Sequence, residues 1–159
     1  MPKDKNQYAH SEQTAARLYA VQALFQMETS QLSVTEITKE FELHRIGAEI
    51  DDTRYNSADI KMFRAILHKA VNEQGRIDKL TNKSLKDSWS LKRIDPTLRA
   101  LFRAAAAEIL INTTPSKAVI NEFIEIAKAF FPDGKETKFV NGVLDNIYST
   151  ILETQQAEP

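Results

Sequence analysis

Apolar residues recur at helical spacing along almost the whole chain, and this periodicity is the feature that most restricts its fold. In KFVNGVLDNIYSTI, from Lys138 to Ile151, one apolar stripe forms at about 100° per residue. Its members are Val140, Val143, Leu144 and Ile147. No run of alternating apolar and polar residues indicates a sheet, and the 159 residues include only four glycines and five prolines. The pattern predicts an all-α fold of about seven helices.

Start and stop signals divide this pattern into separate helices. Ser11 is the expected N-cap of the first helix, and the segment SVTE beginning at Ser33 has the Ser-x-x-Glu form of a capping box. A third helix is expected from about Ala58, with an end or a bend near Gly75.

Proline marks the later boundaries. Asp95 followed by Pro96 predicts an Asp N-cap with proline at the first helical position. Thr114-Pro115 repeats the arrangement, and Pro132-Asp133-Gly134 separates the last two helices. Asp51, Asp52 and Asn56 mark a loop between the second and third helices.

The length suits one domain with a genuine core. We expect a single helical domain over residues 11–153, built from an N-terminal half of about 11–88 and a C-terminal half of about 89–153. Residues 1–10 and 154–159 are polar and lack periodicity, so we expect both tails to be disordered.

Composition excludes several classes of protein. Lys and Arg (21) balance Asp and Glu (22) at a net charge of −1, so any nucleic-acid site must be local. Without cysteine there is no disulfide framework, thiolate zinc site or cysteine nucleophile. The N-terminus lacks the apolar region of a secretory signal, and no apolar stretch approaches the ~18 residues of a membrane span. We expect a cytoplasmic protein.

Residues suited to catalysis are scattered. His10, His44 and His68 lie far apart and form no metal-binding spacing, and no phosphate-binding glycine loop is present. Carboxylates such as Asp51-Asp52 and the Glu122 and Glu125 pair are typical of loop caps and solvated helix faces. We expect no enzymatic activity, no metal and no cofactor.

Three segments together resemble a known family. They are RLYAVQALFQME, WSLKRIDPTLRALFRAAAAEIL, and SKAVINEFIEIAKAFF followed by ETKFVNGVLDNI. In order and spacing, from about Ser11 to Ile151, they resemble the bacterial transcription antitermination factor NusB family. The resemblance implies two helical bundles and a cytoplasmic, RNA-binding adaptor. It implies binding to boxA-type leader RNA with NusE (small-subunit ribosomal protein S-ten), in an antitermination complex of RNA polymerase and other Nus factors that acts chiefly in rRNA transcription.

Phe139 is the residue on which the RNA prediction depends most. It lies about 100° from the centre of the apolar stripe, beside Gly142 in the helix interior. One explanation for this position is that Phe139 packs against a neighbouring helix, with Gly142 admitting close backbone approach. The other is that Phe139 belongs to an RNA-binding surface, and both explanations can hold together.

Single-stranded RNA is usually bound by aromatic side chains that stack on bases and by Lys or Arg at phosphates. The residues predicted to bind RNA are Arg17, Tyr19, Gln22, Phe25, Phe131, Lys135, Lys138, Phe139, Asn141 and Asn146. Of the arginine-rich segment that the family carries near its N-terminus, only Arg17 is present here. Because each phosphate contact strengthens binding, we expect the isolated protein to bind RNA weakly.

Partner contacts and alternative functions follow from the same resemblance. Arg99, Arg103 and Glu108 are predicted to contribute to the NusE-facing surface. One alternative is a protein-interaction module of the same complex without direct RNA contact, and another is a generic helical domain. A third is the NusB-like domain of rRNA cytosine methyltransferases, which the absence of a catalytic domain and of cysteine disfavours. A homodimer that hides the RNA face is left open.

Overall fold

Helices dominate the part of the chain that the structure describes. The computed structural model describes residues 5–47, 49–50, 53–54, 58–85 and 90–157. Its elements are α1 (Lys5–Ser30), α2 (Val34–His44), β1 (Glu49–Ile50), β2 (Thr53–Arg54), α3 (Ile60–Asn72), α4 (Gln74–Ser84), α5 (Pro96–Ile111), α6 (Ser116–Phe130) and α7 (Lys135–Ala157). The all-α prediction is confirmed.

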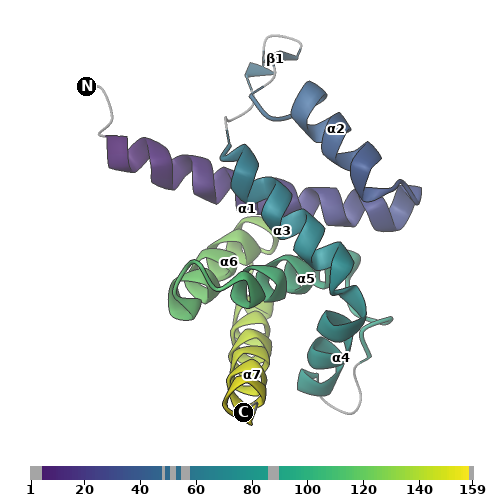
Figure 1. Ribbon diagram of the computed structural model, residues 1–159, viewed down its shortest axis with the longest axis vertical. Coiled ribbons are helices and arrows are strands. Elements are labelled where there is room, and N and C mark those ends of the chain that lie inside the picture. The colour runs from purple at the N-terminus through teal and green to yellow at the C-terminus, as the bar shows by residue number, and fades with distance from the viewer. Residues whose placement is uncertain (1–4, 48, 51–52, 55–57, 86–89, 158–159) are drawn as a thin grey trace.

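Helix α5 lies at the centre of the molecule. Figure 1 shows α1 and α3 above it, α7 below it and α6 beside it. The run Ala104–Ala107 is fully buried, together with Leu101 and Phe102. Alanine has the smallest side chain that still favours a helix, so this run lets neighbouring helices approach α5 closely from several directions.

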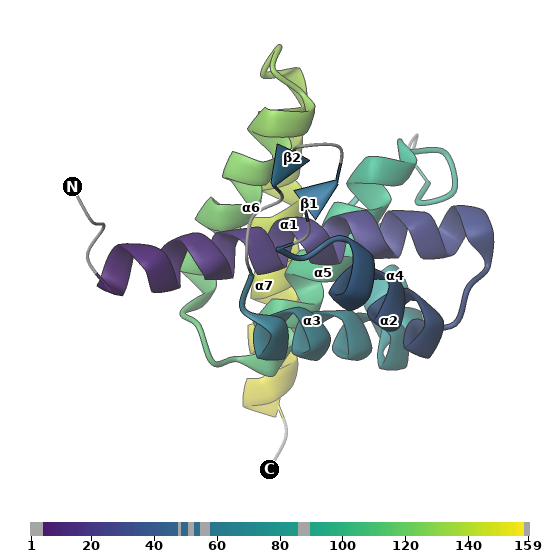
Figure 2. The ribbon, with the colours of Figure 1, turned by 90° about the horizontal axis from the view of Figure 1, so that it is seen from above.

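The helices form two groups, and the second includes α4, which lies within the predicted N-terminal half of about 11–88. Helices α1, α2 and α3 pack against one another, while α4, α6 and α7 pack around α5. Because α5 also packs against α1 and α3, one continuous apolar core joins both groups into a single unit. In Figure 2, α7 runs across the direction of α1. The expected division near residue 88 falls at 86–89, outside the described residues.

Several predicted helix boundaries are confirmed in detail. The Ser33 hydroxyl accepts a hydrogen bond from the Glu36 amide at 3.1 Å, as a capping box requires. The Asp95 carboxylate accepts from the Thr97 amide at 2.7 Å at the start of α5. The break near Gly75 lies at Glu73, between α3 and α4.

Other boundaries differ from the predictions. Helix α1 begins at Lys5 and α7 continues to Ala157, so Ser11 is not an N-cap and the described residues of both predicted tails are helical. Residues 5–10 and 154–157 contain no proline or glycine that would stop a helix. Helix α6 takes Pro115 rather than Thr114 as its N-cap residue.

A short hairpin between α2 and α3 was not predicted. Strands β1 and β2 pair antiparallel, with Glu49 opposite Arg54 and Ile50 opposite Thr53. Strands of two residues are too short to show alternation in a sequence. The loop residues Asp51, Asp52 and Asn56 lie outside the described part of the chain.

Candidate nucleic-acid interface

Phe139 packs partly into the core. Its ring meets that of the fully buried Phe102 edge to face, with centroids 5.9 Å apart and an angle of 73°. Its remaining surface is accessible, so the side chain is half-buried. The apolar stripe beside it, from Val140 to Ile147, is buried as predicted.

Gly142 does not mark a helix crossing. A Cβ atom built on Gly142 would meet no atom within 4 Å, and the residue is exposed. The prediction that glycine admits close backbone approach is therefore wrong within this chain. The packing of Phe139 comes instead from Phe102 of α5.

Phe139 lines a groove between the start of α5 and the start of α7, which we call the α7 groove. It has a volume of about 380 Å³. Its lining residues are Arg93, Ile94, Asp95, Leu98, Phe131, Lys135, Glu136 and Phe139. Three predicted RNA-binding residues, Phe131, Lys135 and Phe139, therefore come together here although they belong to a helix end and the next helix.

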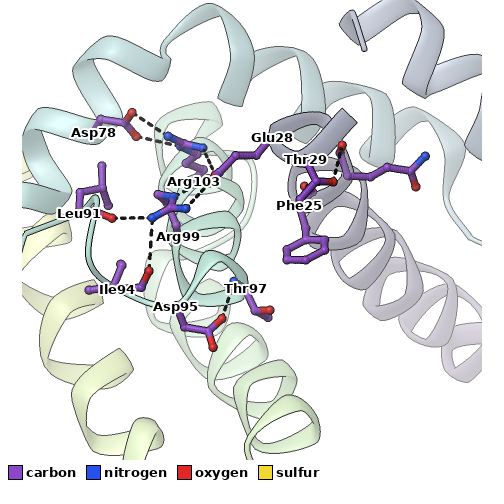
Figure 3. Close-up of polar contacts among 11 residues, drawn as sticks. Phe25, Glu28, Thr29, Asp78, Leu91, Ile94, Asp95, Thr97, Arg99 and Arg103 are labelled. Atoms are coloured by element: carbon purple, nitrogen blue, oxygen red, sulfur yellow. Dashed lines mark hydrogen bonds and ion pairs between the residues drawn. The ribbon is translucent and has the colours of Figure 1, made fainter. Parts of the chain in front are cut away.

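A second groove lies between α1, the end of α2 and the end of α6, and we call it the α1 groove. Its volume is about 330 Å³. Its lining residues are Val21, Gln22, Phe25, Gln26, Thr29, Arg45, Thr97 and Phe130. The predicted residues Gln22 and Phe25 are here, and Figure 3 shows Phe25 projecting from α1 on the side of Thr97.

The two grooves adjoin at the N-terminus of α5. Thr97 lines the α1 groove, while Asp95 and Leu98 line the α7 groove. The consecutive residues Phe130 and Phe131 likewise divide between them. We call the two grooves together the aromatic face; it has four phenylalanines, Phe25, Phe130, Phe131 and Phe139.

Charges on the aromatic face are mixed. Arg93 and Lys135 are exposed at the α7 groove, and Arg45 lines the α1 groove. Asp95 and Glu136 add two carboxylates to the α7 groove. The face therefore offers cations and aromatic rings suited to RNA, together with acidic groups that weaken its attraction for phosphate.

Arg17 does not belong to this face. Its side chain is 2% exposed and donates from Nε to Glu108 Oε1 at 2.7 Å and from Nη2 to Glu108 Oε2 at 2.8 Å. Burial opposes its charge, but Glu108 and, more weakly, Glu122 raise the pKa of the guanidinium. Neither Arg17 nor Glu108, which is also 2% exposed, is accessible to RNA or to a partner, so both assignments are corrected.

Tyr19 is also buried. It is 6% exposed, and its ring packs edge to face against Phe41 of α2 with centroids 6.2 Å apart. Base stacking on Tyr19 is excluded in this conformation. Helix α1 is covered by α2 and α3 on one side and by α5 on another, so its buried surface is wider than one stripe.

The remaining predicted residues of α7 lie elsewhere on its surface. Lys138, Asn141 and Asn146 are exposed but line neither groove.

Arg99 and Arg103 hold the N-terminal half of α5 in place. Arg103 donates from Nε and Nη2 to the two carboxylate oxygens of Asp78, both at 3.0 Å, and pairs with Glu28 at 3.1 Å. Arg99 binds Glu28 through two nitrogens and also donates to the Leu91 carbonyl at 2.8 Å. Figure 3 shows these contacts joining α5 to α1 and α4. Both side chains are only 12–13% exposed, but they line a surface groove of about 680 Å³ together with Lys79 and Lys92, so their part in a partner surface stays a prediction.

Phe130, Arg45 and Arg93 of the aromatic face were not among the predicted RNA-binding residues. Phe130 is 36% exposed, whereas its neighbour Phe131, which was chosen, packs partly on the core. The consecutive residues Phe130 and Phe131 indicated that one ring could reach the surface, but the sequence did not indicate which of the two. No sequence pattern indicated that Arg45 would line the α1 groove, because its position depends on the packing of α2 against α1.

We also searched the described residues for a metal site and for a membrane span. They contain no cluster of three or more side chains suited to a metal ion. No helix among them is long and apolar enough to cross a membrane.

Comparison with known proteins decides the family. The sequence profile of the NusB family matches residues 14–149. The transcription antitermination protein NusB of Sinorhizobium fredii is 44% identical over 151 residues, covering 94% of each chain. The chain belongs to the NusB family. The resemblance read from its three segments is therefore confirmed. The described residues of these segments lie in α1, in α5 with the turn before it, and in α6 and α7.

Solved NusB structures share the fold of this NusB-family chain. T. maritima NusB superposes with a TM-score of 0.69 at 30% identity, covering 86% of this chain and 89% of that one. A complex of the antitermination factors NusB and NusE with dsRNA contains a chain that superposes with a TM-score of 0.70 at 25% identity. The match covers 86% of this chain and 96% of that one.

Proposed function

We propose that this protein is a transcription antitermination factor that binds boxA-type RNA together with NusE. The observation that carries the proposal is the aromatic face, which gathers four phenylalanines and three cations in a chain of the NusB family. A relative of known structure is bound to NusE and dsRNA, which supports NusE and RNA as partners here. RNA polymerase and the other Nus factors would complete the assembly.

The α7 groove supplies the central part of the site. Phe139 is held by Phe102, so its accessible edge is presented without the entropy cost of ordering a free side chain. Lys135 is placed to neutralise a phosphate beside a base that stacks on Phe139 or Phe131. Arg99 and Arg103 act as positioning residues, because they fix the start of α5 that separates the two grooves.

The mechanism is assembly rather than catalysis. Asp95 and Glu136 reduce the attraction of the α7 groove for RNA, so the chain alone binds weakly and NusE supplies the additional contacts. RNA held by both proteins stays tethered to the elongating polymerase. We place the protein in the cytoplasm, because bacterial transcription takes place there.

Binding to a boxA RNA and to a scrambled RNA, each with and without NusE, tests the proposal by fluorescence anisotropy. Both the single-stranded and the double-stranded form of boxA are included, since the solved relative carries dsRNA. Lys135→Glu and Phe139→Leu should weaken the ternary complex about tenfold. Leucine keeps most of the apolar volume against Phe102, so a loss of stacking is separated from a loss of folding.

Lys117→Glu is the matched control, because Lys117 is exposed on α6 away from both grooves. It reverses the same charge and should leave binding unchanged. If Lys135→Glu and Phe139→Leu bind as the wild type does, the α7 groove is not the RNA site. If the wild type does not prefer boxA over scrambled RNA with NusE present, the proposed function fails.

A second candidate function is a protein-interaction module of the same complex with little RNA contact. The carboxylates Asp95 and Glu136 in the α7 groove, and the net charge of −1, favour it. Photocrosslinking of RNA in the complex with NusE separates the two functions. RNA crosslinked to NusE alone would support the second candidate, and RNA crosslinked to Phe139 or Phe131 would exclude it.

A further inference from the structure

Arg45 at the C-terminus of α2 forms no ion pair with any carboxylate that the structure describes. Within the described part of the chain, no Asp or Glu lies within ion-pair distance of its guanidinium. The residue lies outside the regular helix pattern that identified the other candidates, and it lines the α1 groove beside Phe25 and Phe130.

The guanidinium is nevertheless held in a defined place. Its carbon lies 5.1 Å from the centroid of the buried Phe41 ring, within the range of a cation–π interaction. One nitrogen donates to the Gln26 side-chain carbonyl at 3.4 Å, and the Gln26 amide donates onward to Glu40 at 3.1 Å. Gln26 therefore presents an oxygen to Arg45 and links it to the carboxylate of Glu40.

Two exposed aromatic rings share the groove with this cation. Phe25 is 38% exposed and Phe130 is 36% exposed, values that are high for large apolar side chains. Gln22, Thr29 and Thr97 supply polar groups around them. Aromatic faces, an available guanidinium and hydrogen-bonding side chains in one groove of about 330 Å³ are the combination that single-stranded nucleic acid requires.

We propose that the α1 groove is a second nucleotide subsite, in which Arg45 of α2 binds a backbone phosphate and Phe25 and Phe130 stack on the bases beside it. The proposal rests on the proposed RNA-binding function and extends it to a helix that the RNA prediction did not include. The α1 groove adjoins the α7 groove at Asp95 and Thr97, so one strand can occupy both. Arg45 also supplies part of the positive charge that the N-terminal segment of this chain lacks.

The structure offers a competing role for Arg45, namely stabilisation of α2. A cation at a helix C-terminus is favourable, and the Arg45 amide already caps the helix by donating to the Phe41 carbonyl at 3.0 Å. A purely structural role predicts lower stability in Arg45→Ala with no change in the salt dependence of RNA binding. A phosphate contact predicts a change in that salt dependence.

The experiment measures boxA RNA affinity with NusE across a series of salt concentrations. Arg45→Ala should weaken binding about fivefold to tenfold and reduce the slope of log affinity against log salt by about 0.7, the value for one phosphate on a single strand. Arg45→Lys should keep the slope, because it keeps the charge. Phe130→Ala should weaken binding about tenfold at an unchanged slope.

Arg64→Ala is the control, since it removes one positive charge from an exposed ion pair with Glu42 on the neighbouring helices. It should leave affinity and slope unchanged. Equal slopes for Arg45→Ala and the wild type would overturn the subsite while leaving the proposed function intact. Absence of boxA binding by the wild type would overturn both, and Arg64→Ala acting as strongly as Arg45→Ala would show that only net charge matters.

Discussion

Arg17 of α1 and Glu108 of α5 form a two-pronged ion pair inside the core, with nitrogen–oxygen distances of 2.7 and 2.8 Å. The pair joins residues 91 positions apart in the chain. Glu122 of α6 lies 3.7 Å from a third nitrogen of Arg17, so the same guanidinium ties three helices together. These helices carry most residues of the α1 groove, whose relative placement depends on this contact.

Removal of one partner of the buried pair should be costly. Glu108→Ala leaves an uncompensated charge in the interior and should lower the free energy of unfolding by about 3–5 kcal/mol in urea titrations. Glu125→Ala, which breaks an exposed pair with Lys128, should cost less than about 1 kcal/mol. The double change Arg17→Met and Glu108→Leu should restore most of the loss. Equal effects of Glu108→Ala and Glu125→Ala would refute this role.

Acid should loosen the contact of α1 with α5 through Glu28. The hydrogen bond from Arg99, aided by the charges of Arg99 and Arg103, holds the pKa of Glu28 below its ordinary value of 4.5, although burial opposes the shift. Because the folded-state pKa is the lower one, this stabilisation is complete above about pH 4.5 and is lost as the pH falls through the folded-state value. Glu28→Gln should therefore be less stable near neutral pH and lose less stability on acidification. Urea titrations at a series of pH values measure this, and an acid dependence parallel to the wild type would contradict it.

Asp95 has two roles that substitution can separate. It caps α5 through the Thr97 amide, and its charge lies in the α7 groove with Lys135. Asparagine caps a helix about as well as aspartate, so Asp95→Asn should change stability by only a few tenths of a kcal/mol and increase RNA affinity severalfold. Asp95→Ala should increase affinity similarly while losing about 1 kcal/mol. Calorimetry and RNA titration test both effects, and unchanged RNA affinity in both variants would place the RNA away from Asp95.

Gly142→Ala should stabilise the protein. A methyl group at this exposed position of α7 meets no atom within 4 Å, and alanine favours a helix interior by about 1 kcal/mol over glycine. Gly134→Ala is the contrasting variant, because its φ of +80° is unfavourable for a side chain and substitution should destabilise. Thermal unfolding distinguishes the two. Weaker assembly with NusE and RNA in Gly142→Ala alone would show that a partner approaches the helix backbone there.

Local sequence signals predicted the helices but not which of their residues the site would use. Ser33 and Asp95-Pro96 identified helix starts correctly, because a cap depends only on residues within one turn. The stripe from Val140 to Ile147 was assigned to the core correctly for a similar reason, since its spacing defines one face of a helix. Phe139 and its neighbour Lys135 were singled out by their place off the apolar stripe, and the family resemblance then favoured an RNA-binding role over packing alone.

The sequence by itself determined the all-α class, most helix boundaries, the buried stripe of α7 and the family. Only the tertiary structure decided that Arg17 and Tyr19 lie inside, that Phe130 rather than Phe131 is the more exposed ring, and that Arg45 joins the α1 groove. Helix formation depends on neighbours three or four positions away, whereas exposure depends on which distant helices pack on a given face. Helix α1 is covered by α2, α3 and α5, so one stripe could not describe what it buries.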